Sequence, residues 1–426
     1  MVIGKGYKKK GFVTGSEARE LVAKAVAKTG VKGRKVLIII PDSTRTAPMP
    51  MMFRIFHELI AGEAKALDYL IALGTHQPMP DDKINALLGV TAEERKTTFA
   101  KERIFNHRWD KPETFKKIGT IPAEEIEHIT KGMMKEDVPV ALNKMIFDYD
   151  LLLICGPTFP HEVIGFSGGN KYLFPGIAGA DIINFFHWLG AVITNPVING
   201  TKNTPVRAVV DRAASLLKME RLCASMVVTY SGLNGLYIGK PEDAFSAAAD
   251  LSAKLHVIYC DKPYKKILSM APAMYDEIWT AGKCMYKMEP VVADGGDLII
   301  YAPHVAEVSF THGKYIEKIG YHVRDYFMKQ MDKFKGIPGG VMAHSTHVKG
   351  IGAFEDGVEK PRVNVILATK ITPERCKKIN LGYMDPAKIN PKDYEGRESE
   401  GILCVPKAGE MLYRLRKPPA WQVWKD

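Results

Sequence analysis

Cysteine is scarce in this sequence: there are six in 426 residues, and none lies in a C-x-x-C pair or at the spacing of a metal knuckle. In a chain of this length, scattered cysteines predict reduced thiols in a reducing compartment and argue against a disulfide framework. The first ten residues lack the apolar core of a signal peptide. No uncharged apolar run reaches the length that a membrane span needs. We therefore expect a cytoplasmic protein without membrane segments.

Several common catalytic motifs are also missing. No G-x-G-x-x-G follows a predicted strand, and neither a G-x-S-x-G elbow nor an H-E-x-x-H helix occurs. Residues 167–171 match a P-loop poorly, because Asn170 stands where glycine belongs and Tyr172 follows the lysine. His344 and His347 have a spacing that suits a metal, but no third ligand is close in sequence. Two polar surface histidines are therefore the favoured interpretation.

Positive charge is in excess without being concentrated. Lysine and arginine total 59 against 48 aspartates and glutamates, which gives a formal net charge of +11. The densest run is Lys8-Lys9-Lys10, and no basic stripe interleaved with aromatic residues occurs. This distribution favours anionic small molecules over nucleic acid as ligands.

The length and the hydrophobic pattern predict two α/β domains. A chain of 426 residues exceeds what one hydrophobic core usually supports. Continuous apolar runs alternate with helical periodicity, which predicts mostly parallel sheets. Strands are predicted at residues 35–40, 67–74, 151–155, 226–230, 257–260, 296–301 and 363–368, and helices at 16–29, 50–65, 122–135, 276–288 and 314–335. The predicted domains are residues 1–262, with 405–426 packing back on them, and residues 263–404, with an active-site cleft between the two.

Polar residues follow three predicted strands at the point where each strand ends. Asp42 and Arg45 follow the first strand, His76 follows the second, and residues 161–171 follow the third. Because open parallel sheets bind ligands beyond the carboxyl ends of their strands, we expect these residues to converge.

The third of these clusters opens a glycine-rich segment, residues 161–187, in which Lys171 lies between His161 and His187. The glycines are too dense for a helix or strand interior and suit a loop that approaches a ligand closely. An amine between two imidazoles is a reactive combination. A structural turn with a solvated lysine and two packed histidines remains the alternative.

Taken together, these segments resemble the lactate racemase family, whose members use a nickel-pincer nucleotide cofactor. The specific parts are Asp42-Ser-Thr-Arg45, Gly74-Thr-His76, residues 160–171 (Pro-His-Glu-Val-Ile-Gly-Phe-Ser-Gly-Gly-Asn-Lys), residues 175–179 (Pro-Gly-Ile-Ala-Gly), His187, and Lys283 ahead of residues 292–297. The resemblance runs over most of the chain.

The resemblance implies how a cofactor would be held. Lys171 matches the lysine that binds the pincer covalently, and His187 matches the protein ligand to nickel. Asp42 matches a residue near the cofactor nucleotide. Gly168 and Gly169 would lie against the phosphate-bearing arm, where backbone N–H groups can bind anionic oxygen.

The resemblance also implies a reaction, the inversion of a 2-hydroxy acid at C2. His76 and His161 match an acid and a base on opposite sides of the substrate, while hydride passes to the cofactor and returns. Arg45 and Lys283 match the cations that hold the substrate carboxylate. Enzymes that build the cofactor would be partners, and the sequence leaves the oligomeric state open, a homo-oligomer included.

One departure concerns the substrate. Thr280 stands where the lactate enzymes carry a glutamine, and Arg362 falls where a large aromatic residue is expected. These changes predict a substrate larger or more acidic than lactate, such as a sugar acid or a hydroxy-diacid. Two alternatives remain: a non-catalytic binding protein for sugar acids, and a dehydrogenase or lyase on the same scaffold.

Overall fold

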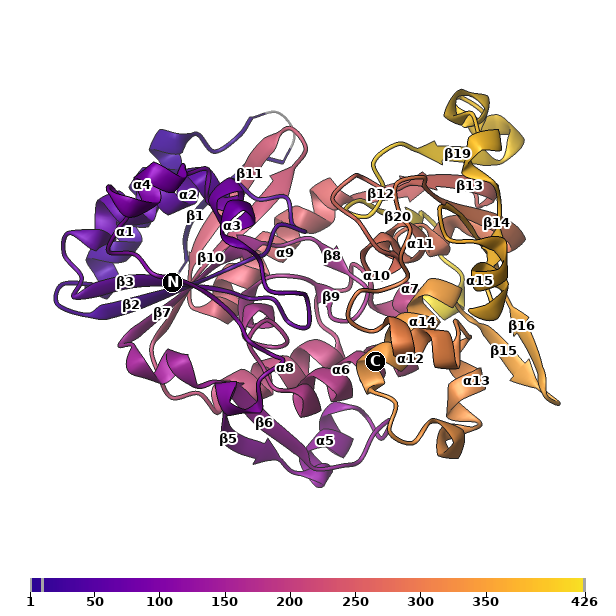
Figure 1. Ribbon diagram of the computed structural model, residues 1–426, viewed down its shortest axis with the longest axis horizontal. Coiled ribbons are helices and arrows are strands. Elements are labelled where there is room, and N and C mark those ends of the chain that lie inside the picture. Colours follow the sequence, from indigo (N-terminus) through magenta and orange to yellow (C-terminus); the bar gives the residue numbers. More distant parts are fainter. Residues whose placement is uncertain (1, 9–10, 424–426) are drawn as a thin grey trace. The chain divides into compact units, whose positions relative to one another are not determined.

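The computed structural model describes residues 2–8 and 11–423 and divides into two compact units. Unit 1 consists of Met1–Phe159, Phe166–Ile183 and Arg207–Leu255, and unit 2 of Pro160–Gly165, Asn184–Val206 and His256–Asp426. Each unit contains its own mostly parallel sheet with helices packed on it, so the predicted α/β fold class is confirmed (Figure 1).

Unit 1 is built on a seven-stranded sheet with the order β1-β11-β10-β7-β2-β3-β4. The five strands from β10 to β4 are parallel, whereas β11 and β1 are antiparallel additions at one edge. The strands are β1 (Ile3–Gly6), β2 (Lys35–Ile40), β3 (Ala66–Ile71), β4 (Ile104–Asn106), β7 (Leu151–Pro157), β10 (Arg221–Thr229) and β11 (Gly232–Gly239), with a separate antiparallel pair β5 (Phe115–Ile121) and β6 (Val138–Asn143).

The helices of unit 1 cover the sheet, which explains why its central strands are apolar on both faces. They are α1 (Gly15–Thr29), α2 (Met49–Phe56), which continues as the π-helix η1 (His57–Ala61), α3 (Asp81–Leu88), α4 (Ala92–Lys96), α5 (Ala123–Ile129), α8 (Pro205–Ser215) and α9 (Pro241–His256). On one face, Val22 of α1 and Phe53 of α2 pack with Ile38 of β2 in one buried cluster. Thr14, not the expected Ser16, caps α1, because its hydroxyl accepts the Glu17 N–H and Glu17 returns the bond.

Unit 2 contains a five-stranded, fully parallel sheet with the order β18-β17-β14-β13-β19. Its strands are β13 (Tyr264–Met270), β14 (Val292–Ala302), β17 (Asn364–Thr369), β18 (Gly382–Tyr383) and β19 (Ile402–Val405), and the smaller pairs are β12 (Val257–Cys260) with β20 (Leu412–Leu415) and β15 (Gly352–Glu355) with β16 (Val358–Pro361). Its helices are α7 (Asn195–Ile198), α10 (Ile278–Ala281), α11 (Lys283–Tyr286), α12 (Gly313–Ile319), α13 (Arg324–Met328), α14 (Gly339–Lys349) and α15 (Pro373–Lys378).

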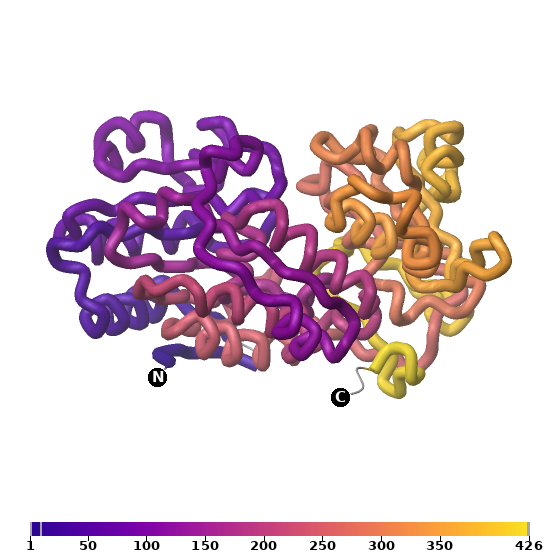
Figure 2. Tube along the Cα trace, turned by 90° about the horizontal axis from the view of Figure 1, so that it is seen from below, coloured from indigo at the N-terminus to yellow at the C-terminus, as the bar shows by residue number. Residues whose placement is uncertain are grey.

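Three segments belong to different units than the predicted ranges. Residues 160–165 and 184–206 are part of unit 2, and α6 (Ala180–Ile193) runs from one unit into the other. The C-terminal segment, residues 405–426, was expected to pack on residues 1–262, a range that includes β12. Its strand β20 pairs in parallel with β12, which itself belongs to unit 2. Figure 2 shows this C-terminal part of the trace in yellow. Trp424 lies outside the described residues.

Two predicted helices are interrupted by glycine. The segment 276–288 forms α10 and α11 with Gly282 between them, and the segment 314–335 is broken after α12 by Gly320, whose φ is +72°. Periodicity alone does not register such breaks, because the apolar positions continue on both sides.

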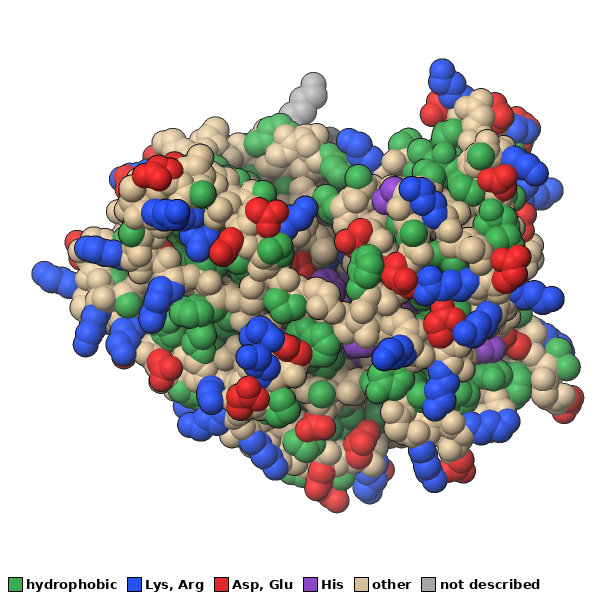
Figure 3. Space-filling model, viewed as in Figure 1, with side chains coloured by type: hydrophobic (Ala, Val, Ile, Leu, Met, Phe, Trp, Pro, Cys, Tyr) green, Lys and Arg blue, Asp and Glu red, His purple; other side chains and the backbone are tan. Residues whose placement is uncertain are grey.

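The distribution of surface charge and the lengths of the helices agree with the scattered basic residues and short apolar runs of the sequence. Lysine and arginine side chains are scattered among acidic ones on the face shown in Figure 3. Within residues 2–8 and 11–423, no helix has the length and apolar character needed to cross a bilayer.

A pair of glycines offers a stability test of the backbone next to His161. Gly165 has a φ of +89°, and an added Cβ would lie 1.8 Å from the carbonyl oxygen of Thr201. Gly336 has a φ of +83° but nothing within 4 Å of an added Cβ. We expect Gly336→Ala to cost about 1 kcal/mol of unfolding free energy and Gly165→Ala about 2 kcal/mol more, measured by chemical denaturation. Equal losses in the two variants would contradict the close approach.

Candidate functional site

The first group of site residues lies at the carboxyl ends of β2 and β3. These strands pair in parallel, with Ile40 opposite Ile71, so the loops that follow them start side by side. Asp42 and His76 extend from these loops, and His76 Nδ1 lies 2.5 Å from Asp42 Oδ2. The structure thus brings together two residues that the sequence separates by more than thirty positions.

Asp42 is buried and surrounded by groups that favour its charged form. Its Oδ1 accepts hydrogen bonds from the backbone N–H of Thr44, at 3.1 Å, and from its hydroxyl, at 2.6 Å. Arg45 donates to the same hydroxyl at 2.6 Å. Burial by itself would raise the pKa of Asp42, but the opposing effects of His76 and Arg45 are larger in sum and hold that pKa below its usual range. Asp42 is therefore a carboxylate at neutral pH.

The carboxylate determines how the His76 ring is used. An ionised aspartate can only accept, so Nδ1 of His76 carries the proton that it donates to Asp42. The neutral ring then has its lone pair on Nε2, which is the arrangement of a general base oriented by a carboxylate. The expected contact of Asp42 with a nucleotide is untested, whereas its contact with His76 was not foreseen.

The loop that carries Lys171 is anchored within unit 1 by a buried arginine. Arg207 is 4% exposed and donates to the carbonyl oxygens of Phe166, at 2.5 Å, and Gly168, at 3.3 Å. Its guanidinium lies 3.8 Å from the ring centroid of Phe245. Lys171 itself lies in the short helix η4 (Gly169–Tyr172) and is partly exposed.

This loop also reaches the His76 loop. The Gly74 N–H donates to the Gly176 carbonyl at 3.0 Å. Tyr172, next to Lys171, is half-buried and lies close enough to Arg45 and Asp42 for their charges to influence its pKa, which desolvation raises. Asp42, Arg45, His76 and the Lys171 loop therefore form one region of unit 1, as the edge rule for parallel sheets predicts.

Gly168 and Gly169 are required by packing within the protein. An added Cβ would lie 2.1 Å from Thr158 Oγ1 at Gly168 and 2.8 Å from Phe245 Cβ at Gly169. The Gly169 N–H is hydrogen-bonded to the Cys223 thiol, whose pKa burial raises to about 12. The contact of these glycines with a cofactor phosphate stays a prediction, and the Gly169 amide already has a partner.

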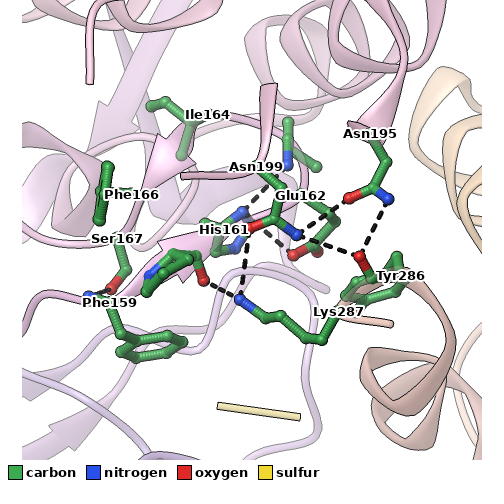
Figure 4. A network of polar contacts seen from close by, with 12 residues as sticks. Phe159, His161, Glu162, Ile164, Phe166, Ser167, Asn195, Asn199, Tyr286 and Lys287 are labelled. Atoms are coloured by element: carbon green, nitrogen blue, oxygen red, sulfur yellow. Dashed lines mark hydrogen bonds and ion pairs between the residues drawn. The ribbon is translucent and has the colours of Figure 1, made fainter. Parts of the chain in front are cut away.

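His161 lies in unit 2 at the centre of a buried polar network (Figure 4). Lys287, which is 1% exposed, donates to the carbonyl oxygen of Pro160 and lies 3.5 Å from Asn199 Oδ1. Asn199 in turn donates to Asn195 Oδ1 at 3.0 Å. These bonds fix the backbone from which the His161 side chain extends. Sequence reasoning missed Lys287, because nothing near it in the chain marks it.

The hydrogen bonds of the His161 ring favour a different neutral tautomer from that of the His76 ring. Its Nδ1 accepts the backbone N–H of Val163 at 3.2 Å, so in the neutral ring the proton is on Nε2. Glu162 Oε2 lies 3.4 Å from the same Nδ1. His76 thus offers a bare Nε2, as a base requires, whereas the neutral His161 ring presents an Nε2–H donor and becomes an acid only when Nδ1 is protonated as well.

His187 belongs to a group of histidines in unit 2. It lies on α6, stacked on Phe186 with ring centroids 4.5 Å apart. Burial, followed by the charges of His347, His312 and His187, lowers the pKa of His344. His344 and His347 are 7% and 4% exposed, so the interpretation of these two as surface residues was wrong; their helix, α14, is buried on all sides.

The remaining predicted residues lie on unit 2. Thr280 is buried and donates to the Glu277 carbonyl at 3.0 Å. Lys283 Nζ lies 4.4 Å from the ring centroid of Tyr275. Arg362 donates to the carbonyl oxygens of Val292 and Glu289, both at 2.7 Å, to Asp294 Oδ1 at 3.1 Å, and stacks on Trp421. These contacts engage both terminal nitrogens of its guanidinium, whereas the buried Nε has no hydrogen-bond partner among the described residues, and they give Arg362 a structural role.

The fold and these residues define a class of protein before any comparison is made. It is a two-unit α/β protein that carries an aspartate-oriented histidine and an arginine at the carboxyl edge of one sheet, and a second, amide-oriented histidine on the other unit. The Asp42–His76 pair beside Arg45 in unit 1 suits proton transfer to and from a bound carboxylic acid.

Comparison with known proteins identifies the family. Residues 17–198 match the family described as lactate racemase N-terminal domain. Lactate racemase from Thermoanaerobacterium thermosaccharolyticum is 25% identical over 293 residues, which are 66% of this chain and 62% of that protein's length. The part of this chain that comprises residues 17–198 therefore belongs to the lactate racemase family.

Two solved structures are similar in fold. A crystal structure of a protein from Thermotoga maritima superposes with a TM-score of 0.87 at 33% identity, covering 96% of this chain and 100% of that one. The apoprotein of the Thermoanaerobacterium thermosaccharolyticum lactate racemase superposes with a TM-score of 0.70 at 20% identity, covering 93% of this chain and 92% of that one.

The Asp42–His76 pair predicts a particular dependence of stability on pH. The pKa of Asp42 is lowered in the folded protein from an ordinary value of 3.8, so its stabilising effect is complete above that value and is lost as the pH falls through the folded pKa. We expect Asp42→Asn to lose about 2 kcal/mol of unfolding free energy at pH 7 and progressively less below about pH 4.

Chemical denaturation at a series of pH values measures this difference, and Asp148→Asn, at an exposed position, is the matched control. A loss in Asp42→Asn that does not change with pH would show that the charge of Asp42 is not the cause.

Proposed function

We propose that this protein is a racemase or epimerase that inverts the C2 carbon of a 2-hydroxy acid with a nickel-pincer nucleotide bound at Lys171. The observation that carries the proposal is the His76 ring, oriented by a buried carboxylate beside Arg45 in the part of the chain that belongs to the lactate racemase family. The activity printed for the related protein is racemisation of lactate.

In this proposal the two histidines serve the substrate hydroxyl. His76, with its bare Nε2, removes the hydroxyl proton as the C2 hydrogen leaves, and His161, protonated on both ring nitrogens, returns a proton when the oxidised intermediate is reduced on its other face. Arg45 and Lys283 bind the carboxylate, which keeps the acid in place between the two steps.

When bound, the cofactor supplies the hydride acceptor and donor that imidazoles cannot provide. A nickel held by the cofactor's own sulfur atoms needs few ligands from the protein. The described residues contain no cluster of three or more histidine, cysteine, aspartate or glutamate side chains suited to a metal, which is compatible with such a cofactor. One imidazole, from His187, would complete the coordination of a nickel that already has sulfur donors. Lys171 would form the covalent link, with Gly168 and Gly169 alongside.

The substrate is proposed to be larger than lactate. Thr280 replaces a longer side chain and donates its hydroxyl to the Glu277 carbonyl. In the proposal, a larger substrate fills the volume that the longer side chain would occupy. Arg362 supports no additional acidic group, because its guanidinium is bonded within unit 2, and we leave it out of the proposed substrate contacts. A sugar acid fits this argument better than a hydroxy-diacid.

The proposal is tested with protein produced together with the enzymes that build the cofactor. We expect a covalent adduct by intact mass spectrometry, absent from Lys171→Ala, and faster racemisation of gluconate than of malate or lactate. Replacing His76 or His161 with asparagine should lower kcat by about 10²- to 10⁴-fold while the adduct remains.

Several results would count against the proposal. Adduct-free protein that still binds sugar acids would indicate a binding protein, and stoichiometric oxidised product without return of hydride would indicate a dehydrogenase. Lactate as the best substrate would overturn the argument from Thr280.

A further inference from the structure

The loop that carries His76 lies beside the end of a further strand of the sheet in unit 1. β4 pairs in parallel with β3, with Asn106 opposite Ile71, so the loop after β4 also begins at the carboxyl edge of the sheet. The His107 N–H donates to the Ile71 carbonyl at 3.2 Å and continues this pairing by one residue. Residues 106–109 therefore start next to the His76 loop, although β4 was not among the predicted strands.

Trp109 is bonded directly to the main chain of His76. Its indole Nε1–H donates to the His76 carbonyl at 2.7 Å, and the ring is half-buried. The His76 N–H donates to the Leu73 carbonyl at 2.9 Å. Both main-chain polar groups of His76 are therefore engaged, and the carbonyl is engaged by a side chain from the loop after β4. An indole N–H can only donate, which suits it to a carbonyl partner.

Asn106 holds the other end of the same loop. Its Oδ1 accepts the Met79 N–H at 3.0 Å, and its Nδ2 donates to the Met79 carbonyl at 2.9 Å. The amide thus bonds to both main-chain groups of one residue, as an opposed residue does in an antiparallel ladder. The segment from His76 to Met79 is fixed at both ends by side chains of the β4 loop.

The backbone of His76 needs this support because of the task that the proposed function gives to its ring. The bond from Nδ1 to Asp42 sets the tautomer, but one side-chain bond does not fix the position of the His76 Cα. Loops move more than the strands that they connect. A displacement of about 1 Å at a catalytic group can cost about a hundredfold in rate. Bonds that limit the movement of this loop therefore bear on the reaction.

We infer that Trp109, supported by Asn106, is a positioning residue that holds His76 where its Nε2 reaches the substrate hydroxyl. The inference rests on the function proposed for His76. Trp109 acts through the main chain of His76, so its role needs no contact with the substrate. Trp421 is a matched tryptophan for comparison, because it is also half-buried but belongs to unit 2 and stacks on Arg362.

The first test compares Trp109→Phe, which removes the N–H donor and keeps an aromatic ring, with Trp421→Phe. In cofactor-loaded protein we expect kcat of Trp109→Phe to fall by about tenfold with KM within about twofold of wild type, because the imidazole is displaced while Arg45 still binds the carboxylate. Asn106→Ala should show the same split, and Trp421→Phe should keep the wild-type values. In a His76→Asn background, Trp109→Phe should lower kcat no further, since its effect passes through the imidazole.

A second measurement does not need the cofactor. The proton between His76 Nδ1 and Asp42 gives a downfield NMR signal, which Asp42→Asn abolishes and thereby assigns. In cofactor-free Trp109→Phe we expect this proton to exchange with water faster by about tenfold or more, whereas Trp421→Phe keeps the wild-type rate.

Equal exchange rates in the two tryptophan variants, or a further fall in kcat in the His76→Asn background, would overturn the inference. If wild-type protein racemises no acid, the proposed function fails, and the exchange rates alone then decide whether Trp109 positions His76.

Discussion

The parallel pairing of β2 with β3 is the constraint on which the site in unit 1 depends. Because the two strands run in the same direction with Ile40 opposite Ile71, the loops beyond them leave the sheet together. Asp42 therefore meets His76, and the carboxylate orients the imidazole. The apolar side chains that hold this pairing point to both faces of the sheet and are covered by helices. The position of one proton on a ring is thus determined by the packing of a whole sheet.

The two histidines illustrate how neighbours assign different tasks to the same side chain. The buried carboxylate of Asp42 accepts a hydrogen bond from Nδ1–H of His76, whereas the backbone N–H of Val163 donates one to Nδ1 of His161. The first arrangement depends on a charge, and the second depends on backbone geometry that the buried ammonium of Lys287 maintains through Pro160. Loss of the Asp42 charge should therefore alter the tautomer of His76, whereas loss of the Lys287 ammonium should alter the backbone that positions His161.

Much of the fold follows from local patterns in the sequence. The continuous apolar run at 35–40 coincides with β2, and the edge rule for parallel sheets predicts from the sequence that Asp42, Arg45 and His76 lie in one region, as they do. The interruptions at Gly282 and Gly320, the burial of His344 and His347, and the role of Lys287 were not predictable in this way. Each depends on residues far away in the chain, and a single sequence does not indicate which of them meet.

The cysteines have a consequence for metal chemistry. All six are free, and burial raises the pKa of every one of their thiols. Electrophiles and soft ions react with the thiolate form, which these side chains rarely adopt near neutrality. In the proposed function, where nickel arrives within a preassembled organic group, this inertness limits the capture of stray copper or zinc by sulfur, because few of these thiols are ionised.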